Sequence, residues 1–181
     1  MKINIDFDYS FLLQEGIIGS EINEKKLNQI QEKLKKEFDK YKPLIESLLA
    51  NEFMNKNIIL DIECFLFSST NKDSIPIPFL LNIASNNVKN IFFDLLIILN
   101  IYLFEKLNIV SKIKLKYSEE YIKIFSIYLS RKIIKVIYPK DYNKILKGYA
   151  FYSFKQYLLD NVEIIESKIL KENIPLEKFL E

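Results

Sequence analysis

The sequence predicts a helix-dominated α+β domain. We expect about five to six helices around one buried helix, with a small sheet of about three short strands. Thirteen of the seventeen residues at 88–104 are apolar, and they surround the helix axis. Residues 1–9 and 109–117 alternate apolar and polar side chains, as half-buried strands do. An all-α bundle is the alternative.

The central helix is predicted at 88–107, and a helix that is apolar on all sides is a buried one. Four polar residues in or just before it fall along one side when they are placed at about 100° per residue. They are Asn87, Asn90, Asp94 and Glu105. This line is where the central helix would meet water or a functional site.

The chain is predicted to begin with a half-buried strand at 1–9, with Asp6 and Asp8 on its wet face. An amphipathic helix follows, with apolar residues spaced by three and four positions. Ser20 or Asn23 can cap its N-terminus, because both side chains accept hydrogen bonds from backbone N–H groups.

Proline positions predict two further boundaries in the first half of the chain. Pro43 lacks a backbone N–H group, so we expect a kink or break there before a second short helix at 44–53. Residues 57–67 are rich in β-formers and are predicted as a buried strand. Pro78 suits the first turn of a helix that ends near Ser85.

The second half of the chain is predicted to contain a third strand and two helices. The strand lies at 109–117, and its lysines would face the carboxylates of the first strand. The next helix opens after Ser118 and closes before Pro139. The last helix begins after Asp141, is weakened at Gly148 and stops before Pro175.

Length and composition predict one domain, 1–181, and exclude several kinds of active site. The chain has no histidine and a single cysteine, Cys64. Serine and cysteine nucleophile systems that need histidine are therefore excluded, as are histidine and cysteine zinc sites. We expect a buried and inert thiol at Cys64, and no cofactor.

The same composition leads us to expect a cytoplasmic protein. A lone cysteine fits a reducing compartment. The first ten residues lack the apolar stretch of a secretory signal, and no apolar run approaches the length of a membrane span. Heavy use of Ile, Lys and Asn suggests an AT-rich genome.

Charge is distributed unevenly along the chain. Residues 1–105 hold 11 basic and 15 acidic side chains, whereas residues 106–147 hold 11 basic and 3 acidic ones. Tyrosines are interleaved with these lysines. Lysine and arginine neutralise phosphates and tyrosine can stack on bases, so 112–147 is a candidate surface for nucleic acid or an acidic partner. Its candidate residues are Lys112, Lys114, Lys116, Lys123, Arg131 and Lys135.

Two acidic motifs have the form of an exonuclease metal site. The sequence DIE at 61–63 resembles the DxE motif of DEDD 3′–5′ exonucleases, and NIFFD at 90–94 resembles their NxxFD motif. The resemblance implies a two-metal nuclease. Its metal ligands would include Asp61, Glu63 and Asp94. In that family a tyrosine precedes the last aspartate by four positions, whereas Tyr157 precedes Asp160 by three.

A shorter motif lies in the first strand. The sequence DFDYS at 6–10 resembles the first motif of haloacid-dehalogenase phosphatases, and Phe67-Ser68 resembles their second. This resemblance implies a magnesium site at the end of the strand. No acidic pair follows a late strand to complete such a site.

These observations favour a non-catalytic binding protein that acts through a macromolecular partner, most simply another protein. Inhibitors, immunity-type proteins and small subunits of larger complexes work in this way. The alternatives are a nucleic-acid-binding module that uses 112–147 and a metal-dependent nuclease. The sequence predicts neither the identity of the partner nor the oligomeric state.

Overall fold

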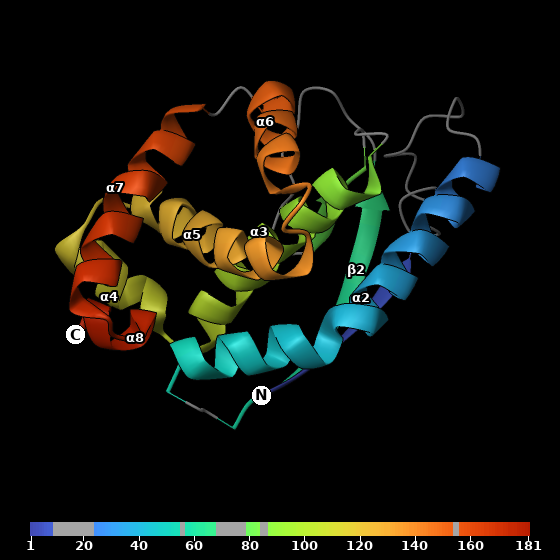
Figure 1. The fold of residues 1–181 in the computed structure, drawn as a ribbon. Helices are drawn as coiled ribbons and strands as arrows, with labels where there is room; N and C mark the ends of the chain where they lie inside the picture. The colour runs from blue at the N-terminus through green and yellow to red at the C-terminus, as the bar shows by residue number, and fades with distance from the viewer. Residues whose placement is uncertain (9–23, 55–56, 68–78, 84–86, 154–155) are drawn as a thin grey trace.

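The computed structural model describes residues 1–8, 24–54, 57–67, 79–83, 87–153 and 156–181 (Figure 1). The strands in this part of the chain are β1 (Lys2–Asp8), β2 (Ile59–Phe67) and β3 (Leu80–Asn82). Its helices are α2 (Glu24–Glu52), α3 (Val88–Lys106), α4 (Ile109–Lys116), α5 (Glu120–Ile137), α6 (Tyr142–Ser153), α7 (Gln156–Glu172) and α8 (Leu176–Leu180). The prediction of a helix-dominated α+β fold is confirmed. The all-α alternative is wrong.

The strands form one parallel sheet in the order β1-β2-β3. The pairing of β1 with β2 runs from Lys2 opposite Ile59 to Asp8 opposite Phe65. Helix α2 joins these two neighbouring strands, because parallel strands need a long crossover connection. The sheet and α2 lie on one side of the molecule, while α4, α7 and α8 lie on the other (Figure 1).

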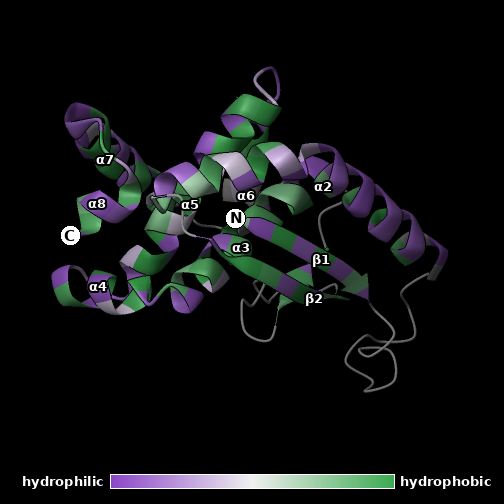
Figure 2. Cartoon of the chain, turned by 90° about the horizontal axis from the view of Figure 1, so that it is seen from below, coloured by the Kyte–Doolittle hydropathy of each residue, from purple (hydrophilic) through white to green (hydrophobic). Residues whose placement is uncertain are grey.

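One face of the sheet is packed against the helices and the other is open. Ile3, Phe7 and the even-numbered residues at 60–66 are buried, while the residues that point the other way up to Phe65 are exposed or partly exposed. Figure 2 shows the alternation as purple and green bands along β1. The predicted strands at 1–9 and 57–67 are therefore confirmed. However, the second of them is buried on one face only over most of its length.

Helix α2 runs without a break through Pro43. Its apolar stripe continues on both sides of the proline, with Phe38, Ile45 and Leu49 all buried. Burial of large side chains at about 1.5–3 kcal/mol each offsets the roughly 3 kcal/mol that an internal proline costs. A separate helix at 44–53 was therefore a wrong prediction, although α2 does change direction along its length (Figure 1). The predicted caps, Ser20 and Asn23, lie outside the described residues.

Side chains of α2 also satisfy the outer edge of β1. The backbone N–H of Ile3 donates to Oε1 of Glu46 at 2.7 Å, and Nε2 of Gln31 donates to the carbonyl oxygen of Phe7. An edge strand with unpaired backbone groups is a template for pairing with another chain. These two contacts occupy part of that edge from within the molecule.

Helix α3 is the buried helix that the sequence predicts at 88–107. Twelve of its residues are buried. Asn87 caps the helix, because its side chain accepts a hydrogen bond of 3.0 Å from the backbone N–H of Lys89. The predicted polar line does not face water throughout, since Asn90 is only 9% exposed while Glu105 is exposed.

The third strand is β3, and the helix predicted from Pro78 to near Ser85 is wrong. Phe65 donates a backbone hydrogen bond of 2.9 Å to Phe79, and Ile83 donates one of 2.7 Å to Phe67. These bonds extend the pairing with β2 beyond both ends of β3. A short apolar run fits a strand or a helix equally well, so pairing with β2 decided the outcome.

Residues 109–116 form helix α4, so the strand predicted at 109–117 is wrong. Ile109, Val110 and Ile113 are buried, which is a helical spacing. Leu115 is 87% exposed, although strand alternation would place it on the buried side with Ile113. The alternating lysines concealed a helical pattern whose apolar face packs against neighbouring helices.

Helix α5 matches the helix predicted between Ser118 and Pro139. The single last helix was a wrong prediction, because α6 ends at Ser153 and α7 begins at Gln156. Gly148 lies within α6 and does not divide it. The predicted stop near Pro175 is confirmed, but the residues beyond it form the short helix α8.

Gly148 is needed for the close approach of α6 to α3, and this can be tested. A Cβ atom at position 148 would lie 2.3 Å from Nδ2 of Asn90. In a free helix Gly→Ala stabilises by about 1 kcal/mol, but here we expect Gly148→Ala to lower the free energy of unfolding by about 1–3 kcal/mol. In an Asn90→Ala background the same substitution should be neutral or stabilising. Urea unfolding measures both effects, and an equal loss in the two backgrounds would contradict the contact.

Candidate functional site

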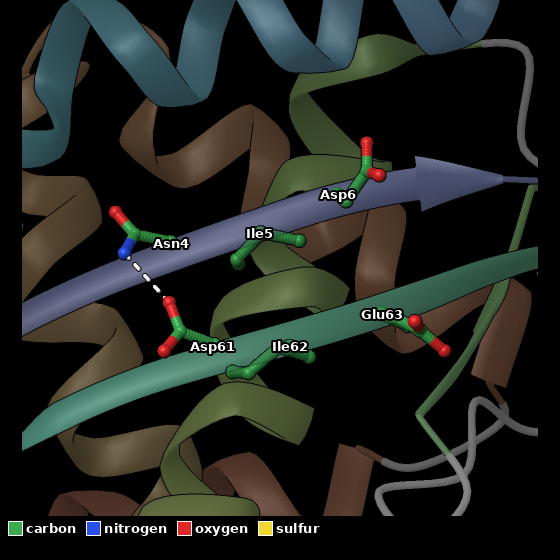
Figure 3. Close-up of a pocket in the computed structure, with 6 residues that line it drawn as sticks. All are labelled: Asn4, Ile5, Asp6, Asp61, Ile62 and Glu63. Atoms are coloured by element: carbon green, nitrogen blue, oxygen red, sulfur yellow. Dashed lines mark hydrogen bonds between the residues drawn. The ribbon is translucent and has the colours of Figure 1, made fainter.

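The open face of the sheet presents polar side chains at its centre (Figure 3). Asn4 and Asp6 come from β1, Asp61 and Glu63 come from β2, and all four are exposed. The strand register places Asn4 beside Asp61 and Asp6 beside Glu63. Nδ2 of Asn4 donates a hydrogen bond of 2.7 Å to Oδ1 of Asp61. These residues line a shallow hollow of about 510 Å³.

Two acidic residues occupy neighbouring positions on this face, with their carboxylate groups pointing away from each other (Figure 3). Asp6 and Glu63 are neighbours on adjacent strands, which are about 4.8 Å apart. Neither forms an ion pair with any residue that the structure describes. The fold therefore gathers negative charge on this face that no described cation neutralises.

The cations near this face lie at its margins. Nζ of Lys42, on α2, donates a hydrogen bond of 2.6 Å to Oδ1 of Asn4. Lys2 is exposed at the start of β1, opposite Ile59. The centre of the face is therefore acidic, and Asn4 connects Lys42 to Asp61.

Apolar side chains flank the acidic centre along β2. Ile59 is 64% exposed and Phe65 is partly exposed. Because alternate residues of a strand share a face, the open side of β2 presents Ile59, Asp61, Glu63 and Phe65 in that order. The row is apolar, acidic, acidic and apolar.

The three lysines of α4 do not share one strand face, although Lys112 and Lys116 lie one helical turn apart and line the same shallow hollow. Side chains two positions apart on a helix point in nearly opposite directions, because each residue turns the helix by about 100°. Nζ of Lys112 lies 4.0 Å from Glu177 of α8, and Nζ of Lys114 lies 3.0 Å from Glu119. Lys116 is exposed. A strand face with three parallel lysines was therefore a wrong prediction.

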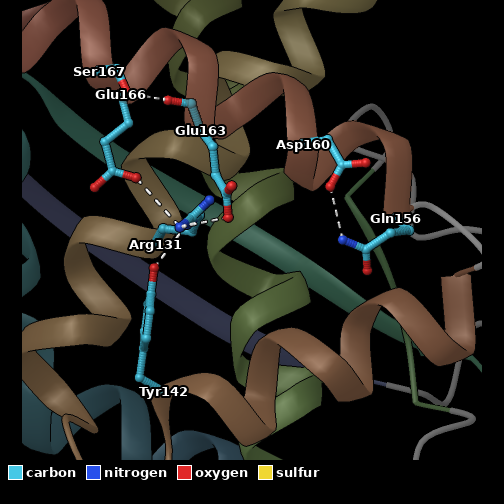
Figure 4. Close-up of polar contacts among 7 residues, drawn as sticks. All are labelled: Arg131, Tyr142, Gln156, Asp160, Glu163, Glu166 and Ser167. Carbon is cyan, nitrogen blue, oxygen red and sulfur yellow. Dashed lines mark hydrogen bonds and ion pairs between the residues drawn. The ribbon is translucent and has the colours of Figure 1, made fainter.

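Arg131 points into the molecule between α5, α6 and α7 (Figure 4). Its side chain is 10% exposed. Nε donates a hydrogen bond of 2.8 Å to the hydroxyl of Tyr142, and Nη2 lies 3.4 Å from Glu166 and 3.9 Å from Glu163. A guanidinium held in this way connects three helices and is closed to a nucleic-acid backbone.

The remaining candidates on α5 differ in their surroundings. Lys123 is partly buried, and desolvation by burial lowers its pKa although the nearby charge of Asp94 opposes this shift. Lys135 is exposed. Lys132, in the same helix, pairs with Glu52 of α2. Carboxylates of α2, α7 and α8 thus pair with three of the 11 basic side chains of 106–147, namely Lys132, Arg131 and Lys112.

The carboxylates with nuclease-like spacing do not converge. Asp61 and Glu63 lie on the open sheet face, whereas Asp94 lies on α3 near Lys123. Among the described residues, no three acidic or cysteine side chains are arranged to hold a metal ion. The phosphatase-like pair, Asp6 and Asp8, lies in the last three residues of β1, and the remainder of that motif lies outside the described residues.

Cys64 lies on the inner face of β2 and is 0% exposed. Burial raises the pKa of its thiol well above the ordinary value. A protonated and inaccessible thiol is a poor nucleophile. The prediction of a buried cysteine is confirmed.

Comparison with known proteins gives no relative. No protein-family model, curated protein or solved structure matches the chain. No helix in the described part of the chain is both long enough and apolar enough to cross a bilayer.

Proposed function

We propose that this chain is a non-catalytic binding protein that acts through a protein partner, and that the open sheet face is the surface it uses. One observation carries the proposal. Parallel sheets almost always have helices on both faces, but no described helix covers this face of β1 and β2. A layer supplied by a partner would complete the usual arrangement.

The character of the face supports a protein partner. It combines an acidic centre with the exposed Ile59 and the partly exposed Phe65. Interfaces between proteins join an apolar core to polar groups that set specificity, and charge complementarity speeds association. Inhibitors, immunity-type proteins and small complex subunits work through such surfaces, and the proposed role requires no cofactor.

Nucleic-acid binding through 112–147 has less support. Lys112, Lys114 and Arg131 lie beside carboxylates, and Arg131 is also buried. Counterion release needs cations that can reach phosphates together. Exposed lysines of this segment occur on three helices, such as Lys116 on α4, Lys135 on α5 and Lys144 on α6.

Reversing charge on the open face should abolish partner binding without unfolding the protein. The test variant is Asp61→Lys/Glu63→Lys, and the matched control is Asp160→Lys/Glu172→Lys on the exposed side of α7. We expect melting temperatures close to the parent for both, because exposed substitutions usually change stability by about 0.5 kcal/mol or less. Affinity capture from the native host should lose its specific partner only with the test variant.

The same samples test the nucleic-acid alternative. A labelled single-stranded oligonucleotide should bind negligibly near physiological salt, as followed by fluorescence anisotropy. Tight binding that weakens with salt by a slope of about −0.7 per phosphate contacted would instead favour the nucleic-acid role. Equal partner capture by the test and control variants would contradict the proposed use of the open face.

A further inference from the structure

We infer that the partner contacts the open sheet face with a basic amphipathic α-helix that lies along β2. Its contacting residues would follow the order apolar, basic, basic, apolar at helix positions i, i+4, i+7 and i+11, which share one side. This inference rests on the proposed function and adds the chemistry and the geometry of the partner.

The spacing of the row on β2 matches a helix. Ile59, Asp61, Glu63 and Phe65 follow one another at about 6.6 Å, twice the rise of a strand. Residues at positions i, i+4, i+7 and i+11 of a helix lie on one side and rise by about 6, 4.5 and 6 Å. The row spans about 20 Å, which a helix of about 13 residues covers.

An extended peptide fits this face less well. Extended segments bind by adding a strand to a sheet edge through their backbone groups. At the edge of β1, Glu46 and Gln31 already bond to the backbone of Ile3 and Phe7. A helix instead satisfies its own backbone and offers side chains to a face.

The acidic charge of the sheet face explains why the two central contacting residues of the partner helix should be basic. An ammonium or guanidinium group above this face would meet the charges of Asp6 and Glu63, neither of which has an ion-pair partner among the described residues. Asp61 differs, because it already accepts a hydrogen bond of 2.7 Å from Asn4. Glu63 should therefore contribute more to binding than Asp61. Contact with Ile59 and Phe65 at the ends would anchor the helix through apolar area.

A second copy of the chain is a poorer occupant of this face. Two copies related by a two-fold axis would place the same patch against itself. Carboxylates of Asp6, Asp61 and Glu63 would then approach the same carboxylates of the other copy. A nucleic acid would meet the same repulsion.

The test uses the full chain and two synthetic helical peptides of about 17 residues. One carries Leu-Lys-Lys-Leu at positions i, i+4, i+7 and i+11, and the other carries the same residues at these positions in the order Lys-Leu-Leu-Lys. By fluorescence anisotropy at low salt, the first should bind at least about tenfold more tightly, a difference that opposite charges across an interface supply. Glu63→Gln should weaken binding by about tenfold and Asp61→Asn by less. These isosteric changes at exposed sites retain the fold.

A charge-swap experiment completes the test. Asp61→Lys/Glu63→Lys should reverse the preference, so that a Leu-Glu-Glu-Leu peptide binds more tightly than Leu-Lys-Lys-Leu. Any of three results would overturn the inference. Both peptide orders could bind equally well, or binding of the first peptide could be insensitive to Glu63→Gln. The protein could also sediment as a dimer that Asp61→Lys/Glu63→Lys dissociates. If the face variants lose the native partner but the peptide does not compete with it, the proposed function stands and the helix inference fails. If they retain the partner, the proposed function fails.

Discussion

Replacing Leu96 with alanine should lower the free energy of unfolding by about 2–5 kcal/mol. Leu96 lies in the middle of α3 and is 0% exposed. Its removal deletes buried methyl groups and leaves a cavity that the surrounding helices can fill only in part. Ile98→Ala should cost a similar amount, because Ile98 is 2% exposed on the same helix. Urea unfolding monitored by circular dichroism gives both values.

The matched control is Leu115→Ala. This substitution deletes the same atoms at a site that is 87% exposed, so it should change stability by about 0.5 kcal/mol or less. It also tests the assignment of α4, because a strand at 109–117 would bury Leu115 with Ile113. Unchanged urea midpoints for Leu96→Ala and Ile98→Ala would contradict the central position of α3. A large loss for Leu115→Ala would contradict helix α4.

The elements predicted correctly are those whose burial pattern is set within one segment. Residues 88–107 are apolar on all sides, so burial follows from the segment itself. Residues 1–9 alternate without exception and read as a strand with one wet face. The wet face also indicates a sheet that is not covered on both sides, and the open face of β1 and β2 agrees with this.

The wrong predictions concern segments whose structure depends on distant partners. Residues 80–82 became a strand because β2 offers them hydrogen bonds. Residues 109–116 became a helix because Ile109 and Ile113 are buried together. The missing backbone N–H of Pro43 predicts a break in the helix, but the stripe of buried apolar side chains on α2 continues past this residue. Short patterns allow two structures, and tertiary packing chooses between them.

The candidate site also depends on contacts between residues that are distant in sequence, which the sequence alone does not predict. The sequence places Asp6 on one wet strand face, but only the pairing of β1 with β2 brings it beside Glu63. The basic segment was predicted to be a binding surface because the carboxylates that pair with some of its cations are far away in sequence. Glu52 lies 80 positions from Lys132, and Glu177 lies 65 positions from Lys112. No local count of charge could show these pairs.

Glu52 joins three helices at the end of α2. One carboxylate oxygen accepts a hydrogen bond from Nζ of Lys132 on α5, and the other accepts one of 2.9 Å from the backbone N–H of Leu176 at the start of α8. Its side chain is 12% exposed. Burial lowers the pKa of Lys132, but the hydrogen bond and charge of Glu52 oppose this, and the pKa is raised overall. The pair is therefore a stabilising contact of the folded state.

Glu52→Ala should lower the free energy of unfolding by about 2–4 kcal/mol, because it leaves two donors without their acceptor. Glu52→Gln keeps an acceptor but loses the charge, so its cost should be smaller, about 1–2 kcal/mol. Glu32→Ala, at an exposed site on α2, is the control and should change little. A double-mutant cycle with Lys132→Met isolates the pair, and a cost for Glu52→Ala no larger than the control would contradict it.

The pH dependence of the same variants gives an independent check. Because the folded pKa of Lys132 is raised above its ordinary 10.5, the stabilisation is fully present below pH 10.5 and is lost as the pH rises through the folded value. The difference in stability between the parent and Glu52→Gln should therefore stay constant from about pH 6 to pH 9 and shrink only in stronger alkali. A difference that disappears already near pH 8 would show that another group carries the effect, since Lys132 keeps its charge throughout that range.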